Sequence, residues 1–252
     1  MDVAPPQPGP LGLAGGDEFH PGNEPADALL AAAALDSGPA YVVATAARAR
    51  PEVAVGQAKT WFQQFGLDLS ELAVHTKSQA RDAAIADAAA HAGFFYITGG
   101  DPGLVASMLR GSLVGDAMIA AWQKGAVLAG SSAGAMALCA HTLVRRSFPG
   151  HSERRAAPGL GVVPDSAVLP HLDTFGHAWL PSARRALPTA TLIGIDERTC
   201  ALWQSGRWRC LGAGGVTVTV PGRDSARFAA GFIEGLPQPS TLSLPSSNGS
   251  AQ

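Results

Sequence analysis

A serine flanked by glycines lies in the segment Gly130-Ser131-Ser132-Ala133-Gly134, which has the G-x-S-x-G pattern of a nucleophilic serine. An apolar stretch precedes this segment and an Ala-rich stretch follows it, so the pattern predicts a tight turn between a strand and a helix. Such a turn exposes the central side chain, and the N–H of Ala133 at the start of the helix can stabilise an oxyanion. Ser132 is therefore the candidate nucleophile. The alternative interpretation is that these small residues only pack a helix against a strand.

A serine hydroxyl needs a base within hydrogen-bond reach to become a good nucleophile. Among the seven histidines, His171 is the best candidate, because it follows the apolar stretch 167–170 and should emerge at the carboxyl edge of a sheet. His75 also follows an apolar stretch and is the lesser alternative. His177 is close enough to His171 in the sequence to line the same site. The remaining histidines are predicted to lie on the surface or in helix packing.

A second oxyanion donor is expected from the segment Thr98-Gly99-Gly100-Asp101, which follows another apolar stretch. Glycines free backbone N–H groups to face a substrate oxygen, and Gly100 is the candidate donor. The segment also has a structural interpretation, in which Asp101 caps the helix that begins at Pro102. Both interpretations can hold together.

Short apolar stretches alternate along the chain with longer Ala-rich stretches at helical spacing. This pattern predicts an α/β fold with a mostly parallel sheet and helices on both faces. The predicted strands are 11–14, 41–45, 72–75, 94–98, 126–129, 167–169 and 192–195. The predicted helices are 26–35, 52–65, 78–91 and 102–123. Three β-type segments, 201–203, 208–211 and 216–220, predict a small antiparallel extension at the C-terminal end.

The composition argues against several classes of function. The 252 residues carry a formal net charge of -2 and no basic block, which argues against nucleic acid as a partner. No apolar stretch approaches the roughly 20 residues needed to cross a bilayer, and the N-terminus lacks a secretory signal, so we expect a cytoplasmic protein without a membrane partner. Three cysteines are too few for a disulfide framework, and no ligand spacing predicts a metal site or cofactor.

The domain organisation follows from the distribution of apolar residues. Residues 11–235 are predicted to form a single α/β hydrolase-type domain, because a chain of this length can bury one large core. Residues 1–10 are rich in Pro and residues 236–252 are rich in Ser and Pro, so both are predicted to be disordered tails.

At this point the motifs resemble those of the S51 serine peptidases, which include aspartyl dipeptidases and cyanophycinases. The resemblance rests on segments in the same order along the chain: 15–19, 94–101, 125–135, 159–161 with 170–171, and 194–199. It implies a flavodoxin-like fold similar to class I glutamine amidotransferases, with a serine nucleophile and a triad in the order Ser, acid, His. It assigns Ser132 and His171 to the triad, and Gly100 and Ala133 to the oxyanion hole.

The resemblance also implies a triad acid about fifteen to twenty residues beyond the nucleophile. The only carboxylate in that window is Glu153, which is therefore the predicted acid. Asp196 and Glu197 resemble a family motif after a strand and are interpreted as structural. After His171, relatives carry arginines that would bind an acidic substrate group, whereas this chain has Asp173 and His177. These two residues and Asp101 are the predicted substrate-binding residues.

The leading hypothesis is hydrolysis of an amide bond in a small peptide through an acyl-enzyme on Ser132, without a cofactor. An esterase would use the same chemistry. A different alternative is a catalytically weak S51-like protein used for binding or assembly. The sequence leaves the oligomeric state open, including a homodimer.

Overall fold

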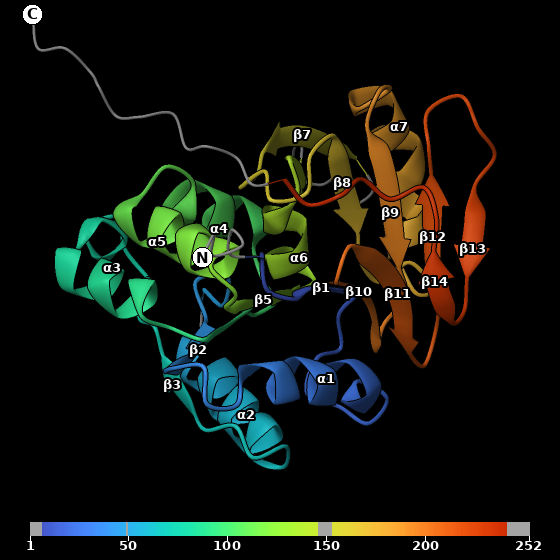
Figure 1. Cartoon of the computed structure of the whole chain (residues 1–252). Coiled ribbons are helices and arrows are strands. Elements are labelled where there is room, and N and C mark those ends of the chain that lie inside the picture. Colours follow the sequence, from blue (N-terminus) through green and yellow to red (C-terminus); the bar gives the residue numbers. More distant parts are fainter. Residues whose placement is uncertain (1–6, 49, 146–152, 241–252) are drawn as a thin grey trace, which may run out of the picture.

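The computed structural model describes residues 7–48, 50–145 and 153–240, and these form an α/β structure built on an eight-stranded sheet (Figure 1). The order of strands across this sheet is β14-β11-β10-β1-β5-β4-β2-β3. The strands are β1 (Leu11–Ala14), β2 (Ala40–Val43), β3 (Leu69–Glu71), β4 (Phe94–Ile97), β5 (Val127–Ser131), β10 (Thr199–Gln204), β11 (Arg207–Gly212) and β14 (Gly231–Ile233). Strands β1 to β5 pair in parallel, while β10, β11 and β14 pair antiparallel. The predicted α/β class with a mostly parallel sheet is confirmed, although the sheet is mixed.

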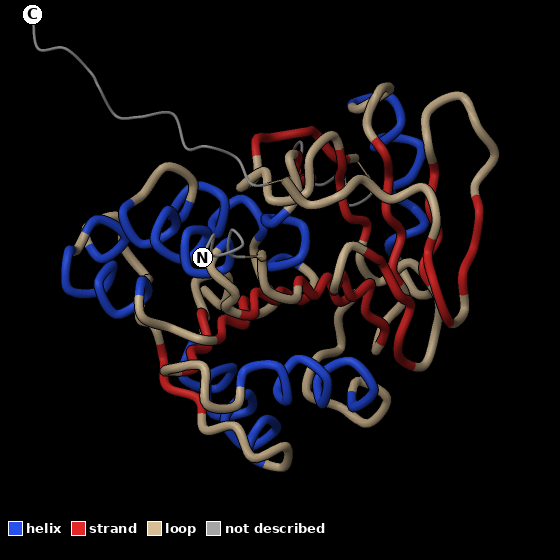
Figure 2. The backbone as a smooth tube through the Cα atoms, in the orientation of Figure 1, coloured by secondary structure: helices blue, strands red, loops and turns tan. Residues whose placement is uncertain are grey.

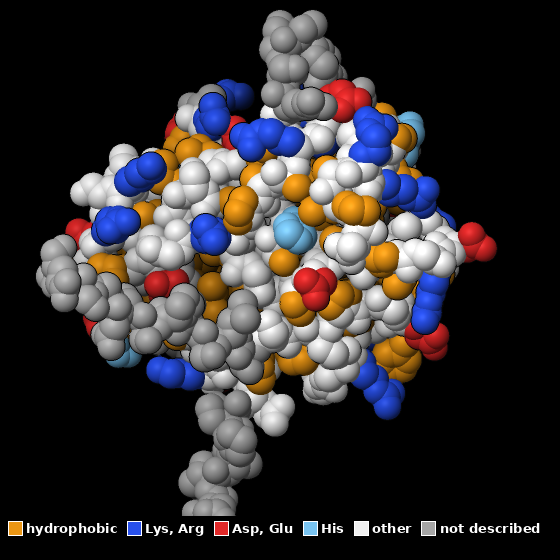
Figure 3. All heavy atoms as spheres, turned by 90° about the horizontal axis from the view of Figure 1, so that it is seen from above, with side chains coloured by type: hydrophobic (Ala, Val, Ile, Leu, Met, Phe, Trp, Pro, Cys, Tyr) orange, Lys and Arg blue, Asp and Glu red, His pale blue; other side chains and the backbone are white. Residues whose placement is uncertain are grey.

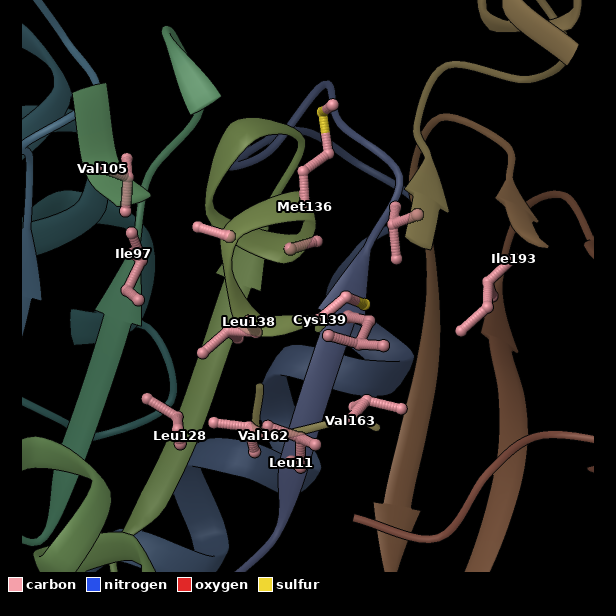
Figure 4. Close-up of a cluster of buried hydrophobic side chains, with 14 of the residues drawn as sticks. Leu11, Ile97, Val105, Leu128, Met136, Leu138, Cys139, Val162, Val163 and Ile193 are labelled. Atoms are coloured by element: carbon pink, nitrogen blue, oxygen red, sulfur yellow. The ribbon is translucent and has the colours of Figure 1, made fainter. Parts of the chain in front are cut away.

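Helices cover both faces of this sheet (Figure 2). One face packs against α1 (Glu24–Ala34) and α2 (Pro51–Gln63), with side chains such as Leu30 and Phe62 fully buried. The other face packs against α3 (Ala83–Ala90), α4 (Pro102–Leu109), α5 (Leu113–Gln123) and α6 (Ala133–Leu138). Figure 4 shows apolar side chains from β1, β4, β5 and α6 meeting in this second core. Burying each leucine or phenylalanine stabilises the fold by roughly 1.5–3 kcal/mol.

A second sheet has the strand order β13-β12-β9-β8, with β8 (Ser166–Leu169), β9 (Thr191–Ile195), β12 (Val216–Thr219) and β13 (Ala226–Phe228). Strands β8 and β9 are parallel neighbours, so their carboxyl ends lie at the same edge. The 3-10 helix η2 (Gly176–Trp179) and α7 (Leu180–Ala186) connect them. The strands predicted at 167–169 and 192–195 therefore exist but lie outside the main sheet.

A separate hairpin is formed by β6 (His141–Arg145) and β7 (Arg154–Pro158), which pair antiparallel. The sequence pattern does not predict these two strands. The sequence of β7, Arg-Arg-Ala-Ala-Pro, lacks the β-branched and aromatic residues that are typical of strands. Its pairing with β6 and its contacts with α7 therefore override its local preference.

Two predicted helices are interrupted. The predicted helix 102–123 is broken between α4 and α5, because Gly111 has a φ of 62° and Ser112 begins a new helix by accepting a hydrogen bond from the N–H of Gly115. The predicted helix 78–91 becomes the 3-10 helix η1 (Gln79–Arg81) followed by α3. The strand predicted at 72–75 is displaced, because β3 ends at Glu71, where its pairing with β2 ends.

Parts of both predicted tails pack against the domain. The indole N–H of Trp122 donates to the carbonyl oxygen of Gly9 at 2.8 Å, and the indole N–H of Trp208 donates to the carbonyl oxygen of Pro237 at 3.0 Å. The tail predictions were therefore wrong for residues 7–10 and 236–240, because the buried Trp rings supply polar partners as well as apolar surface. The other predicted tail residues, 1–6 and 241–252, lie outside the described residues.

Within the described part of the chain, no single helix is long and apolar enough to cross a membrane. Among the helices of the described residues, one pair, α4 and α5, bent by 89°, reaches that length and composition together.

Candidate active site

Ser132 lies at the turn between β5 and α6, as the G-x-S-x-G pattern predicts. Its backbone has a φ of 49° and a ψ of -108°, a strained conformation for a residue with a side chain. The flanking glycines allow this turn, because a Cβ on Gly134 would lie 2.2 Å from the carbonyl oxygen of Ile97, and one on Gly130 would lie 2.5 Å from the carbonyl carbon of Gly134. The close packing of the turn directs the Ser132 side chain out of the sheet.

His171 contacts this serine. Its Nε2 lies 3.0 Å from Oγ of Ser132. The residue comes two positions after β8 and has a φ of 53°, and its backbone N–H donates to the carbonyl oxygen of Gly15 at 2.7 Å. Phe175 stacks on the imidazole, with ring centroids 4.6 Å apart. Gly16 also packs closely against the imidazole, because a Cβ on Gly16 would lie only 2.1 Å from Cε1 of His171.

The carboxylate beside His171 belongs to Glu197. Its Oε1 lies 2.7 Å from Nδ1 of His171 and also accepts a hydrogen bond from Oγ1 of Thr174 at 3.2 Å. The backbone N–H of Glu197 donates to Oδ1 of Asp173 at 3.0 Å, which holds the turn after β9. With an N–H on Nδ1 donated to Glu197, Nε2 is left as an acceptor toward Ser132. Ser132, His171 and Glu197 thus form a continuous chain of hydrogen bonds.

The prediction for Glu153 needs correction. Its Oε1 pairs with the guanidinium of Arg185 at 2.9 Å, on an exposed part of the surface. The interpretation of Asp196 and Glu197 as a structural pair holds only for Asp196. The Asp196 carboxylate is buried, accepts the N–H of Gly215 at 2.9 Å and pairs with Arg227 at 2.5 Å. The carboxylate next to His171 therefore comes from the turn after β9 and not from the segment that follows Ser132.

Gly100 and Ala133, the predicted oxyanion donors, line the same pocket as Ser132 and His171. Ala133 is the first residue of α6, so its N–H has no acceptor within the helix. Gly100 has a φ of 137°, a conformation that favours glycine, and a Cβ there would lie 2.1 Å from the carbonyl oxygen of Ala46. The two residues therefore follow two neighbouring parallel strands, β4 and β5.

Glu18 is a site residue that was not singled out from the sequence. Its Oε1 accepts the backbone N–H of Gly99 at 2.8 Å, and its Oε2 accepts the hydroxyl of Ser131 at 2.9 Å. One carboxylate thus holds the Gly99 loop against the turn that carries Ser132. The signal in the sequence was Gly15-Gly16-Asp17-Glu18, a glycine pair followed by acids directly after a predicted strand.

The pocket that contains Ser132 and His171 has a volume of about 1370 Å³. Five arginines line it, namely Arg48, Arg110, Arg145, Arg154 and Arg155. Among the described residues that line the pocket, Asp101 is the one carboxylate, and it both pairs with Arg48 and caps α4 by accepting the N–H of Leu104 at 3.0 Å. The capping interpretation of Asp101 is confirmed. The pocket is therefore strongly cationic.

The other predicted site residues lie elsewhere. Asp173 supports the Glu197 turn as described above, and His177 lies exposed on η2. Neither belongs to the pocket wall. The alternative base His75 pairs with Glu71, with Nε2 and Oε1 2.8 Å apart, and is also outside the pocket wall. The free cysteines Cys139, Cys200 and Cys210 are buried.

Among the described residues, no three His, Cys, Asp or Glu side chains lie close enough to one another to hold a metal ion. One buried acid lies away from the pocket, on α1. Burial raises the pKa of Asp27 to about 7, while a hydrogen bond from the indole of Trp61, 2.8 Å long, opposes that rise.

Comparison with known proteins finds cyanophycinases among the similar proteins. A cyanophycinase from Trichormus variabilis is 29% identical over 191 residues, which are 72% of this chain and 64% of the relative. A cyanophycinase from Geminocystis herdmanii is 32% identical over 165 residues, 62% of this chain and 60% of the relative. The matched regions thus span less than two thirds of these relatives' own length.

The structural comparison covers more of the fold. A crystal structure of a peptidase from an acI-B1 Actinobacterium superposes with a TM-score of 0.77 at 26% identity, covering 90% of this chain and 96% of that one. The model of peptidase family S51 matches residues 13–209, which include the serine turn, His171 and Glu197. The chain therefore belongs to peptidase family S51.

Proposed function

We propose that this chain is a serine-type peptidase that cleaves an amide bond of a small peptide through an acyl-enzyme on Ser132. The observation that carries the proposal is the chain of hydrogen bonds from Ser132 to His171, 3.0 Å, and from His171 to Glu197, 2.7 Å. This is the arrangement in which a base removes the serine proton and an acid orients the base and stabilises its cation.

In the first half of the reaction, Oγ of Ser132 attacks the substrate carbonyl carbon while its proton passes to Nε2 of His171. The N–H groups of Ala133 and Gly100 stabilise the negative oxygen of the tetrahedral intermediate. The imidazolium then donates its proton to the departing amine, and the amide bond breaks. In the second half, His171 takes a proton from water, the hydroxide attacks the acyl-enzyme, and Ser132 is restored with release of the carboxylic acid.

The alternative of a binding or assembly protein depended on the absence of a suitable triad acid. Glu197 beside His171 supplies such an acid and favours an enzyme. An esterase would use the same residues, so amide and ester substrates must be compared to identify the leaving group.

The test is hydrolysis by the purified chain of a dipeptide library and of cyanophycin, the polymer that the relatives' name implies. The proposal predicts release of free amino groups by the wild-type chain and none by Ser132→Ala, with both proteins folded. Turnover of esters only would support the esterase. Equal turnover by Ser132→Ala would contradict the mechanism.

A further inference from the structure

Phe175 is an exposed aromatic side chain on the wall of the pocket. It lines the same pocket as Ser132 and His171, and its exposed fraction is 49%. Its ring stacks on the imidazole of His171, with an angle of 22° between the two planes. This stacking covers one part of the phenyl ring and leaves apolar surface open to solvent beside the proposed catalytic base.

The backbone holds Phe175 in this place. Three N–H groups donate to the carbonyl oxygen of His171, those of Thr174, Phe175 and Gly176, at 3.2, 3.1 and 2.6 Å. Gly176 permits so tight a turn, because a Cβ there would lie 2.0 Å from the carbonyl oxygen of Pro170. The turn therefore fixes the backbone of Phe175 relative to His171. A residue held in this way loses little conformational entropy when a ligand covers it.

Trp179 is the other aromatic side chain next to Phe175. The centroids of the two rings lie 5.5 Å apart, with an angle of 56° between their planes. Trp179 is buried, and the guanidinium carbon of Arg154 lies 3.8 Å from the centre of its ring. Its surface is thus already covered by the protein. Among the described residues that line the pocket, Phe175 is therefore the aromatic side chain of Phe, Tyr or Trp type that a substrate can reach.

Further apolar side chains line the same pocket, namely Leu104, Met136, Leu143 and Val144. On the face of the molecule seen in Figure 3, hydrophobic side chains in orange lie among Lys and Arg side chains in blue. Hydrophobic residues that are exposed singly are common on protein surfaces. An exposed phenylalanine inside a pocket that also has apolar walls instead indicates a place for an apolar group of a ligand.

The proposed reaction indicates which substrate residue meets Phe175. Nε2 of His171 gives its proton to the departing amine, so that nitrogen must come within hydrogen-bond reach of Nε2. The N–H groups of Gly100 and Ala133 hold the carbonyl oxygen on the acyl side. The residue that carries the departing amine therefore lies beside the imidazole and beside the phenyl ring stacked on it.

We propose that Phe175 is a specificity-determining residue that binds an apolar side chain, above all an aromatic one, on the substrate residue that carries the departing amine. The inference rests on the proposed function, because it uses His171 as the proton donor to that amine. Contact between the two side chains removes apolar surface of both from water, and aromatic rings gain further from offset or edge-to-face packing. A polar side chain of similar size gains neither and must give up its contacts with water.

The test is a binding measurement on Ser132→Ala, which does not depend on turnover. Isothermal titration calorimetry compares three dipeptides, Ala-Phe, Ala-Leu and Ala-Gln, each acetylated at its N-terminus and amidated at its C-terminus so that none is charged. The Phe peptide should bind at least about tenfold more tightly than the Gln peptide, with the Leu peptide between them. Raising the salt concentration should not reduce this difference, because it does not depend on charge. Equal binding of the Phe and Gln peptides would overturn the proposal.

Variants in the same background then locate the subsite. Phe175→Ala should bring the affinity for the Phe peptide to within about threefold of that for the Gln peptide, whereas Phe175→Leu should retain most of the preference. Phe232→Ala is the matched control and should leave binding unchanged, because Phe232 is 56% exposed on β14, outside this pocket. An equal loss of affinity for both peptides in Phe175→Ala would show that Phe175 only supports His171, and would overturn the proposal.

Cleavage by the wild-type chain separates this inference from the proposed function. Among dipeptides with the same first residue, kcat/KM should be at least about tenfold higher with Phe than with Gln in the second position. If peptides are cleaved with equal kcat/KM whatever their second residue, the proposed function stands and this inference fails. If the Phe peptide binds selectively but no amide bond is cleaved, the subsite stands and the proposed function fails.

Discussion

The carboxylate of Glu197 lies 2.7 Å from Nδ1 of His171, although the two residues are 26 positions apart and follow different strands. The parallel register of β8 and β9 explains this proximity, because Leu169 pairs with Gly194 and both strands end at the same edge. The residues that follow each strand are therefore neighbours. A glutamate after one strand can orient a histidine after the other.

Replacing this glutamate tests its role. Glu197→Gln should lower kcat by roughly 10³-fold to 10⁴-fold with a small change in KM, because the amide favours the wrong imidazole tautomer. The melting temperature should change little, since the substitution conserves shape. Steady-state kinetics on a cleaved peptide measures the effect. Glu153→Gln is the matched control and should be nearly silent, and a larger loss at Glu153 than at Glu197 would rule out the assignment.

The sequence was sufficient for those parts of the site that are set locally. The turn at Ser132 follows from glycines between a strand and a helix, and the place of His171 follows from the strand before it. Glu197 was missed because its role depends on β8 and β9 being neighbours, which no local pattern reveals. Its signal was a carboxylate directly after a buried strand, the same argument that identified His171.

Long-range packing also explains the other differences between the sequence-based predictions and the structure. Strand β7 has weak strand preference and forms because it pairs with β6 and packs against α7. The break between α4 and α5 depends on one glycine with a positive φ, which an apolar helical pattern conceals. The Glu18 bridge joins residues 81 and 113 positions away.

Gly16 offers a test of the fit around the histidine. A Cβ at this position would lie 2.1 Å from Cε1 and 2.5 Å from Nε2 of His171, so Gly16→Ala should displace the imidazole and abolish most of the activity. Gly206→Ala is the control, because Gly206 has a φ of 79° but open space around its Cβ position. Gly206→Ala should lose about 1 kcal/mol of stability from backbone strain and Gly16→Ala at least as much, measured by urea unfolding, yet only Gly16→Ala should lose kcat. Equal kcat values in the two variants would contradict the predicted clash.

Glu18 is expected to act as a positioning residue. Glu18→Ala releases the Gly99 loop from the serine turn and should lower kcat by roughly 10²-fold, comparable to the loss of one oxyanion donor, with little change in KM. Glu18→Gln should restore most of the activity, because its amide oxygen can accept from the N–H of Gly99 while its amide N–H donates to Ser131. Steady-state kinetics on a cleaved peptide gives kcat and KM for both variants and tests this prediction. Loss of activity in both to the same extent would mean that the negative charge is required.

Asp27 predicts a pH dependence of stability. Burial raises its pKa to about 7 in the folded chain, whereas an unfolded chain has an ordinary aspartate that ionises near pH 4. Between about pH 4 and pH 7 the unfolded state loses its proton first, so the free energy of unfolding should fall as pH rises through this window. Asp27→Asn keeps an acceptor for the indole N–H of Trp61 but cannot ionise, so it should remove this fall in the free energy of unfolding. The variant should therefore be more stable than wild type at pH 8, by up to about a few kcal/mol. Urea titrations of both proteins at pH 5 and pH 8 measure it, and parallel pH profiles would contradict the prediction.

The central claim is that Ser132 is a nucleophile activated by His171. It is tested most directly by reacting the folded chain with a fluorophosphonate and locating the adduct by peptide mass spectrometry. The account predicts one adduct, on Ser132, which forms rapidly in the wild-type chain and in Glu153→Gln, slowly in Glu197→Gln and not in His171→Ala. An adduct on Ser131, or no adduct on the folded wild-type chain, would contradict the account.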